Sequence, residues 1–232
     1  MRIPVDLHIH TCLSPCGDDS MTPNNIVRMA AIKELACIAI TDHNAGDHAA
    51  LAQQLGREWD VLVVPGVEVT TQEEVHTLCY FENPDTLMAF CDWQQASMPP
   101  VRNREDIFGH QVVVDAEDQV VGGRENLLIL AGGYSLEEVE AQCLSMGGVM
   151  VPAHINRSSN SLLRNLGLIP PSLAAKTVEV YGEEDGLPVE GFRVIHSSDA
   201  HYLENILEPE FFLDVPELSV PAILDVLRRG KE

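Results

Sequence analysis

Short, uninterrupted apolar runs recur along the chain and predict buried strands. Residues 36–40 and 61–64 are wholly apolar, which is typical of strands covered on both faces in a parallel sheet. Residues 3–10 also have strand character, with successive side chains pointing to opposite faces. Further strands are predicted at 74–81, 148–152, 177–181, 192–196 and, at the periphery, 208–215.

Helical patterns occupy most of the intervals between these runs. Thr22 followed by Pro23 marks a helix start, because Thr caps a helix well and Pro fits its first position. Ser135 and Glu138 form a capping box that opens another helix. The predicted helices cover about 23–34, 47–57, 84–95, 135–146 and 220–228.

Strands that alternate with helices predict an α/β fold, with a parallel sheet inside and helices outside. We expect one domain, residues 1–232, because α/β barrels of this length are commonly undivided. The pattern weakens only within 97–124, where it indicates a hairpin at 111–115 and 119–122. This stretch is predicted to be an insert or a lid over the barrel mouth.

The charge balance narrows the expected partners. The chain has 36 Asp and Glu but only 14 Lys and Arg, for a formal net charge of −22. Duplex binding relies on many Lys and Arg contacts to phosphates, so we expect no extended nucleic acid as a partner. A small phosphorylated substrate remains compatible with this charge, because bound divalent ions would offset the carboxylates that hold them.

The apolar runs are too short to predict a membrane span, and the N-terminus has no signal-peptide character. We therefore expect no membrane partner. The six cysteines show no spacing typical of a disulfide framework, which favours a reducing, cytoplasmic location.

Residues of metal-ligating type follow most of the predicted inner strands. His8 and His10 lie on one face of the first strand, where both imidazoles can reach one ion. The full set of candidates is His8, His10, His43, Glu68, His76, His154, Asp199 and His201. Ligands at so many strand ends could not all reach one site on an open sheet, so the pattern predicts a barrel-like closure.

The number and type of these ligands predict a metal centre with more than one ion. A mononuclear catalytic site needs about three protein ligands, so eight candidates suit two to three divalent ions, with Glu68 and Asp199 as bridges. Imidazole together with carboxylate favours Zn, Mn or Fe. Ions clustered in this way serve hydrolysis.

The motifs resemble those of the PHP (polymerase and histidinol phosphatase) domain family over roughly residues 3–215. The matching motifs are His8-Ile9-His10, Thr41-Asp42-His43, Gly66-Val67-Glu68, His76, Ala153-His154 and Asp199-Ala200-His201. The resemblance implies a distorted seven-stranded, TIM-like β/α barrel with a trinuclear metal centre that hydrolyses phosphoesters. By position it implies three ligand sets: His8, His10, Glu68 and Asp199; Glu68, His76 and His154; and His43, His201 and one residue of loop 11–21.

The loop ligand is where the chain departs from the family pattern. Counting forward from His10 favours Cys16, whereas counting back from Thr22 favours Asp18, and Asp19 also competes. Carboxylate is the commoner ligand in this role, so Asp18 is our prediction. Cys16, binding as a thiolate, is the alternative.

Other polar residues have predicted roles beside these ligands. Arg157 is the best phosphate clamp in a chain so poor in cations, and with Glu68 and Asp199 it completes the predicted catalytic set. Asp6 is predicted to orient a ligating imidazole, and Asp42 to do the same or to contact a metal-bound water. His48 and His110 are expected at the surface.

The sequence thus predicts a metal-dependent hydrolase that cleaves a small phosphomonoester or phosphodiester through metal-activated hydroxide. One alternative is an amidohydrolase-like enzyme acting on C–N bonds. Such barrels usually carry a carbamylated strand lysine, whereas Lys176, the lysine nearest a predicted strand, lies at the strand's start. The other alternative is a non-catalytic metal-binding module.

Overall fold

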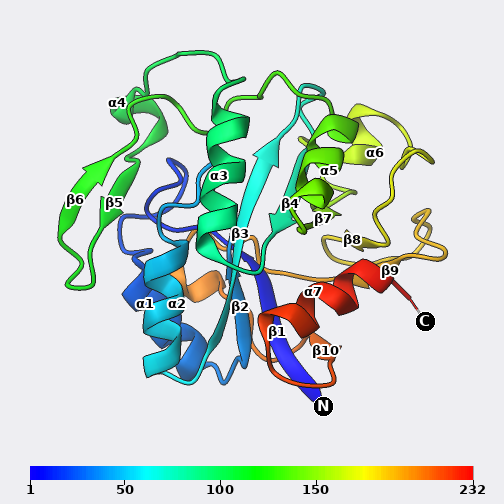
Figure 1. Cartoon of the computed structure of the whole chain (residues 1–232), viewed down its shortest axis with the longest axis horizontal. Coiled ribbons are helices and arrows are strands. Elements are labelled where there is room, and N and C mark those ends of the chain that lie inside the picture. The colour runs from blue at the N-terminus through cyan, green and yellow to red at the C-terminus, as the bar shows by residue number, and fades with distance from the viewer. Residues whose placement is uncertain (232) are drawn as a thin grey trace.

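The computed structural model describes residues 1–231, which form a mixed α/β fold around one curled sheet (Figure 1). The six strands of this sheet follow the order β10-β1-β2-β3-β4-β7. Their bounds are β1 (Arg2–Ile9), β2 (Cys37–Ile40), β3 (Leu62–Thr70), β4 (His76–Tyr80), β7 (Val149–Pro152) and β10 (Phe212–Asp214). Every strand of this sheet was predicted, and β3 is longer than its apolar run because it continues through Pro65 and Gly66.

Five helices of ten or more residues pack around the sheet: α1 (Pro23–Ile32), α2 (Ala49–Glu58), α3 (Pro84–Gln95), α5 (Leu136–Ser145) and α7 (Val220–Arg229). Shorter ones are α4 (Glu105–Phe108), α6 (Leu162–Asn165) and the 3-10 helix η1 (Leu203–Asn205). The predicted caps are present: the Thr22 side chain accepts from the Asn25 N–H, and Ser135 and Glu138 form the capping box of α5. Local sequence therefore accounts for where these helices begin.

The prediction of a parallel sheet is wrong beyond its first three strands. β1, β2 and β3 pair in parallel, but β3–β4, β4–β7 and β1–β10 pair antiparallel. The five residues between β3 and β4 are too few for the crossover that parallel strands require. β4 consequently begins where β3 ends, and it presents His76 at its start rather than at its end.

The predicted seven-stranded barrel is not closed by continuous strand pairing in this structure. β8 (Thr177–Glu179) and β9 (Arg193–Ile195) form a separate parallel pair. On one side the Ile155 N–H donates to the Glu179 carbonyl at 2.9 Å, and on the other Ala200 bridges to Ile9 of β1. Strands of three residues offer few ladder bonds, so a curled six-stranded sheet with a flanking pair replaces the closed barrel.

The apolar faces of the sheet are covered by helices. Val5, Leu7 and Val64 belong to a buried cluster with Ile223 and Leu227 of α7. Other clusters pack the sheet against α1 and α2, and against α3 and α5. Because these faces are covered, the polar ligand residues gather at one end of the sheet.

The stretch 97–124 contains the predicted hairpin, formed by β5 (Val112–Val114) and β6 (Val120–Gly123), at the left edge of Figure 1. It packs on the loop that follows β1: the Val112 N–H donates to the Cys12 carbonyl at 3.1 Å, and His110 meets Asp19 at 2.9 Å. Its role as a lid stays a prediction. Among residues 1–231, no helix combines the length and apolar character needed to cross a membrane.

Candidate metal centre

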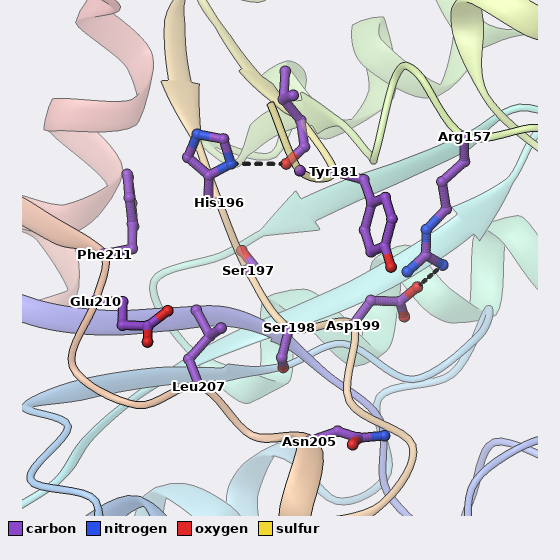
Figure 2. Close-up of a pocket in the computed structure, with 12 residues that line it drawn as sticks. Arg157, Tyr181, His196, Ser197, Ser198, Asp199, Asn205, Leu207, Glu210 and Phe211 are labelled. Carbon is purple, nitrogen blue, oxygen red and sulfur yellow. Dashed lines mark hydrogen bonds and ion pairs between the residues drawn. The ribbon is translucent and has the colours of Figure 1, made fainter. Parts of the chain in front are cut away.

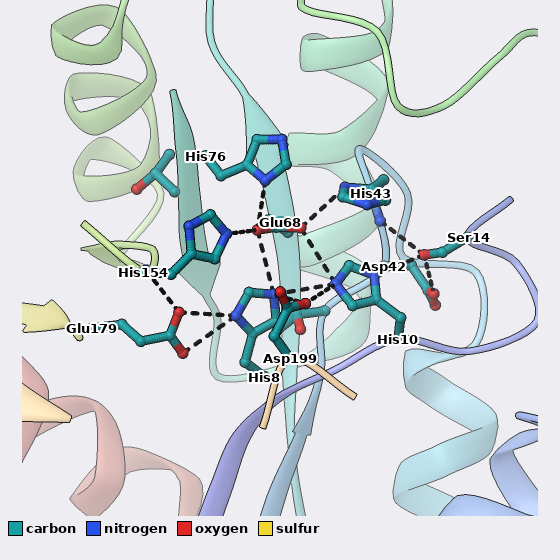
Figure 3. Close-up of polar contacts among 12 residues, drawn as sticks. His8, His10, Ser14, Asp42, His43, Glu68, His76, His154, Glu179 and Asp199 are labelled. Carbon is teal, nitrogen blue, oxygen red and sulfur yellow. Dashed lines mark hydrogen bonds and ion pairs between the residues drawn. The ribbon is translucent and has the colours of Figure 1, made fainter. Parts of the chain in front are cut away.

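The carboxylate of Glu68, a residue of β3, lies at the centre of a buried cluster of imidazoles (Figure 3). His76 Nδ1 and His154 Nε2 lie 2.9 and 3.1 Å from Glu68 Oε1. His43 Nδ1 lies 3.0 Å from Glu68 Oε2. His8 and His10 approach the same carboxylate at 3.4 and 3.3 Å. One acidic side chain therefore faces five of the predicted histidine ligands.

His8 and His10 face each other with atoms suited to hold a cation. Their Nε2 atoms are 3.1 Å apart, and Asp199 Oδ1 lies 3.3 Å from one and 3.1 Å from the other. The other ring nitrogen of His8 donates to Glu179, and that of His10 donates to Ser14 Oγ. In the neutral rings, each of the two facing Nε2 atoms therefore carries a free lone pair. A metal ion placed between these nitrogens and the carboxylates of Glu68 and Asp199 could be bound by all four side chains.

The predicted ligands come together in overlapping sets. Three groups have ligand atoms that all lie within 4.8 Å of one another: His8, His10, Glu68 and Asp199; His43, Glu68 and His76; and His10, His43 and His201. The first is the set that the motifs implied. In the second, His43 joins Glu68 and His76, while His154 touches the Glu68 carboxylate from the opposite side.

Buried polar atoms without well-formed hydrogen bonds support the fit to metal ions. Within the described part of the chain, four buried ligand atoms lack a hydrogen bond of good geometry. Glu68 Oε2 and Asp199 Oδ1 face imidazole nitrogens, and His43 Nδ1 faces Glu68 Oε2, whereas His154 Nδ1 has no partner. Leaving such atoms unpaired costs free energy unless another group binds them. The donor set, imidazole and carboxylate, is the one that Zn, Mn and Fe accept, so the residues fit divalent metal ions.

The electrostatics of the cluster keep its carboxylates charged. Burial alone would raise the pKa of Glu68, but the imidazoles of His76, His8 and His43 outweigh it and hold the pKa well below its usual range. Burial would likewise lower the pKa of His10, yet the close carboxylates of Asp199 and Glu68 raise it to about 9. In the absence of metal, protons thus occupy the positions that ions would take.

Two candidate ligands have unusual backbone conformations. His154 follows β7 with φ of 27°, and Asp199 follows β9 with φ of 50°. Side chains other than glycine rarely adopt the left-handed region, and residues held there cluster at functional sites. At both positions the chain turns sharply after its strand, which directs the side chain into the cluster.

Glu179, which the sequence analysis missed, holds two of the candidate ligands. It accepts from His8 Nδ1 at 3.0 Å and from the His154 N–H at 2.9 Å. The residue is the last of β8 and is buried. A glutamate between Val178 and Val180, in an otherwise apolar strand, was the signal available in the sequence.

Asp42 orients an imidazole through an intermediate hydroxyl. Ser14 Oγ accepts from His10 Nδ1 at 2.9 Å and donates to Asp42 Oδ1 at 2.7 Å. Thr11 Oγ1 donates to the other Asp42 oxygen at 2.7 Å and accepts from His48 Nδ1. The predicted role of Asp42 therefore fits, although its target is His10.

Asp6 and His48 differ from their predicted roles. The Asp6 carboxylate accepts from the backbone N–H groups of Ser198 and Leu207 at 3.0 Å, so it ties segments of the chain rather than holding an imidazole. His48, expected at the surface, is only 1% exposed. It lies under the β5–β6 hairpin, where its Nε2 accepts from the Val114 N–H at 3.0 Å.

The structure does not bring Asp18 into the cluster. Its carboxylate accepts from the backbone and hydroxyl of Ser20, on the exposed side of the loop. Asp19 turns away as well, toward His110. Cys16 instead lies at the cluster, with Sγ 3.0 Å from His201 Nε2.

Arg157 joins the cluster to a neighbouring pocket of about 750 Å³ (Figure 2). Its guanidinium is paired with Asp199 Oδ2 and stacks 4.6 Å from the ring centre of Tyr181. Figure 2 also places Asn205 and Glu210 along this pocket. A ligand in the pocket would have its end nearest Arg157 beside the metal cluster.

A curled β/α sheet that brings six imidazoles and two carboxylates to one end gives an α/β protein with a candidate metal centre. No protein-family model matches the chain. An uncharacterized Methanocaldococcus jannaschii protein, MJ1587, is 38% identical over 76 residues, which cover 29% of this chain and 44% of that protein.

Solved structures share the fold over nearly the whole chain. Endonuclease Q from Pyrococcus furiosus, a lesion-specific endonuclease, has a TM-score of 0.73 at 16% identity, covering 98% of this chain and 56% of that one. A protein provisionally described as a metal-dependent phosphoesterase, from Bifidobacterium adolescentis, has a TM-score of 0.63 at 20% identity, covering 98% and 96%. An amidohydrolase from Chromobacterium violaceum has a TM-score of 0.61 at 18% identity, covering 93% of each chain.

These neighbours confirm, at the level of the fold, the resemblance to the PHP family that the motifs indicated. The three are described as an endonuclease, provisionally as a metal-dependent phosphoesterase, and as an amidohydrolase, and at 16–20% identity what they share with this chain is the fold. This chain spans less than two thirds of Endonuclease Q and of the M. jannaschii protein.

The prediction that the protein has no extended nucleic acid as a partner is wrong. Endonuclease Q, whose fold this chain shares, has been crystallised with a 27-mer duplex that carries an abasic lesion at the active site; that structure has a TM-score of 0.72 at 16% identity. The inference failed because net charge averages over the whole surface, whereas metal ions are the largest local charges where a phosphate binds.

Proposed function

We propose that this protein is a metal-dependent hydrolase of phosphoesters. The observation that carries the proposal is the set of buried ligand atoms that converge around Glu68 and Asp199, placed beside a pocket that presents Arg157. Divalent ions bound there would polarise a phosphoryl group and activate water for attack. A centre of up to three ions suits the three overlapping ligand sets.

The side chains of this protein have separate parts in that reaction. Glu68 belongs to two of the ligand sets and would help to hold more than one ion, whereas Asp199 would hold an ion together with His8 and His10. Arg157 pairs with Asp199 and lies at the edge of the pocket, where its fork of N–H donors suits two phosphate oxygens. Stacking on Tyr181 limits the conformations that the Arg157 side chain can adopt.

The amidohydrolase alternative finds less support in the placement of the lysines. Lys33 pairs with Glu208, and Lys176 packs against Gly230 at the start of β8, whereas Glu179 at the other end of β8 faces the cluster. A hydrolysis assay distinguishes the proposed enzyme from the alternative, a non-catalytic metal-binding module.

The test is hydrolysis by protein reconstituted with Mn, Fe or Zn, measured on a phosphomonoester, a phosphodiester and a duplex with an abasic site. Glu68→Gln keeps the volume but removes the central charge, so we expect turnover to fall by at least about a hundredfold, whereas Glu58→Gln, on the exposed end of α2, leaves it unchanged. Arg157→Ala should raise KM more than it lowers kcat, with exposed Arg164→Ala as its control. Phosphate release at the wild-type rate by Glu68→Gln would contradict the proposal, and so would no release by any reconstituted form.

A further inference from the structure

We propose that Cys16 binds a metal ion as a thiolate, together with His43 and His201, and so makes the third metal site selective for thiophilic ions. The inference rests on the metal centre of the proposed function, but it does not require any particular reaction. It assigns to a cysteine the position that the sequence predicted for Asp18.

The first observation is the contact between Cys16 and His201. Cys16 Sγ lies 3.0 Å from His201 Nε2. The other ring nitrogen, Nδ1, lies 2.8 Å from the Asp199 carbonyl oxygen, which can only accept a hydrogen bond. Nδ1 therefore carries the proton, and Nε2 directs its lone pair at the sulfur. The thiol proton lies between two metal-binding atoms, at the position where an ion would replace it.

The second observation concerns the imidazoles around the sulfur. His43 is 6% exposed, and its Nδ1 faces the Glu68 carboxylate at 3.0 Å. Its ring also lies within hydrogen-bonding reach of Cys16. Ligand atoms of His10, His43 and His201 all lie within 4.8 Å of one another. Imidazoles thus converge on the same point as the thiol, in the donor combination that zinc commonly takes.

The loop is built so that Cys16, and not its acidic neighbours, reaches this point. The Gly17 N–H donates to the Ser14 carbonyl at 2.8 Å, and the Asp18 N–H donates to the His201 carbonyl at 2.9 Å. These bonds tie the backbone on both sides of Cys16 to the site, while the Asp18 side chain bonds Ser20 outside it. The loop backbone therefore presents the sulfur to the two imidazoles.

A thiolate changes which ions the site prefers. Soft sulfur ligands select zinc and similar ions, whereas the sets around Glu68 contain only imidazole and carboxylate, which also suit manganese. We expect the third site to take up zinc, cobalt or cadmium in preference to manganese. The other two sites would discriminate less.

The test measures binding and not turnover. Metal-free protein is titrated with Co²⁺, and we expect a near-ultraviolet sulfur-to-cobalt charge-transfer band that Cys16→Ser and Cys16→Asp lack. Cys16→Asp should still bind the ion, because a carboxylate replaces the thiolate. Asp18→Asn and Asp19→Asn, which change neighbouring side chains outside the cluster, should keep the band.

Thiol reactivity gives a second readout on the unaltered protein. Cys16 is exposed and the other five cysteines are buried, so one thiol should react rapidly with Ellman's reagent in the metal-free protein. Zinc should slow that reaction at least tenfold, and manganese should slow it much less. A charge-transfer band that persists in Cys16→Ser, or no protection by zinc, would overturn the inference.

The two proposals fail separately. A cobalt band in a protein that hydrolyses no phosphoester would leave the thiolate site standing and refute the proposed function. Phosphoester hydrolysis with no band and no zinc protection would do the reverse.

Discussion

At the scale of single residues, the candidate ligands are held in place by side chains that lie behind them and are not themselves candidate ligands. Glu179 fixes the ring of His8 and the backbone of His154, and Ser14 with Asp42 fixes the ring of His10. These contacts select the ring nitrogen that keeps its lone pair for a metal. Replacing groups that hold a ligating side chain commonly weakens metal binding by about 10- to 100-fold.

We predict that Glu179→Gln weakens metal binding by about 10- to 100-fold while the protein remains folded. Glutamine keeps the size of the side chain but supplies one acceptor in place of a carboxylate that accepts from both His8 and the His154 N–H. Competition with a chromogenic chelator measures the affinity, and circular dichroism checks the fold. Glu183→Gln, in an exposed loop, is the matched control, and equal affinities for the two variants would refute this role.

At the scale of elements, the insert 97–124 supports the loop that carries Cys16. Gly109 lies directly against Pro15 of that loop, with φ of 95°. A Cβ at this glycine would lie 2.1 Å from the Pro15 carbonyl oxygen, so no side chain fits without displacing the loop. The hairpin also bonds His48, which connects through Thr11 and Asp42 toward the His10 ring.

Gly109→Ala should therefore lower the free energy of unfolding by about 1–3 kcal/mol, because alanine disfavours this φ and clashes with Pro15. The displaced loop should also lose the zinc protection of the Cys16 thiol. Gly122→Ala in the same insert is the control: its Cβ would meet nothing within 4 Å, and we expect a change within about 0.5 kcal/mol. Urea unfolding compares the two, and indistinguishable midpoints would show that the insert does not support the loop.

At the scale of the whole molecule, metal binding and stability are linked through the protons of the cluster. The pKa of His10 and that of His43 are both about 9 in the metal-free protein, because nearby carboxylates outweigh the effect of burial. Protonated imidazoles there contribute stability below pH 6.5, and this contribution is lost as the pH rises through 9. Metal ions bind only the deprotonated rings, so the stability that bound metal adds to the folded protein grows over the same pH range.

We predict that the melting temperature of metal-free protein falls as the pH rises from 6.5 to 9. We also predict that the difference in melting temperature between metal-loaded and metal-free protein, called the gap below, widens over this range. An ion at about 100 times its Kd adds roughly 2.7 kcal/mol per site. Thermal melts followed by circular dichroism, with and without a chelator, measure both effects. A gap that stays constant or narrows toward pH 9 would contradict the assignment of these imidazoles as ligands.

The sequence by itself determined most elements and the types of residue in the candidate site. Apolar runs and caps are local signals, so they predicted the strands and the five longer helices, including the β5–β6 hairpin, but not the short α4, α6 and η1. Ligand residues beside strands predicted a shared site because strands of one sheet bring their ends together. The motif resemblance then supplied the fold family that the solved structures support.

Only the tertiary structure decided how these elements pair and which neighbouring side chains meet. Strand direction depends on the connection after β3, so the antiparallel β4 and the separate β8–β9 pair were not visible in an apolar pattern. Counting residues could not choose between Cys16 and Asp18, because hydrogen bonds within the loop and to His201 set which side chain faces inward. Glu179 became part of the site for the same reason, since a long-range contact with His8 gives it a role that no local signal specifies.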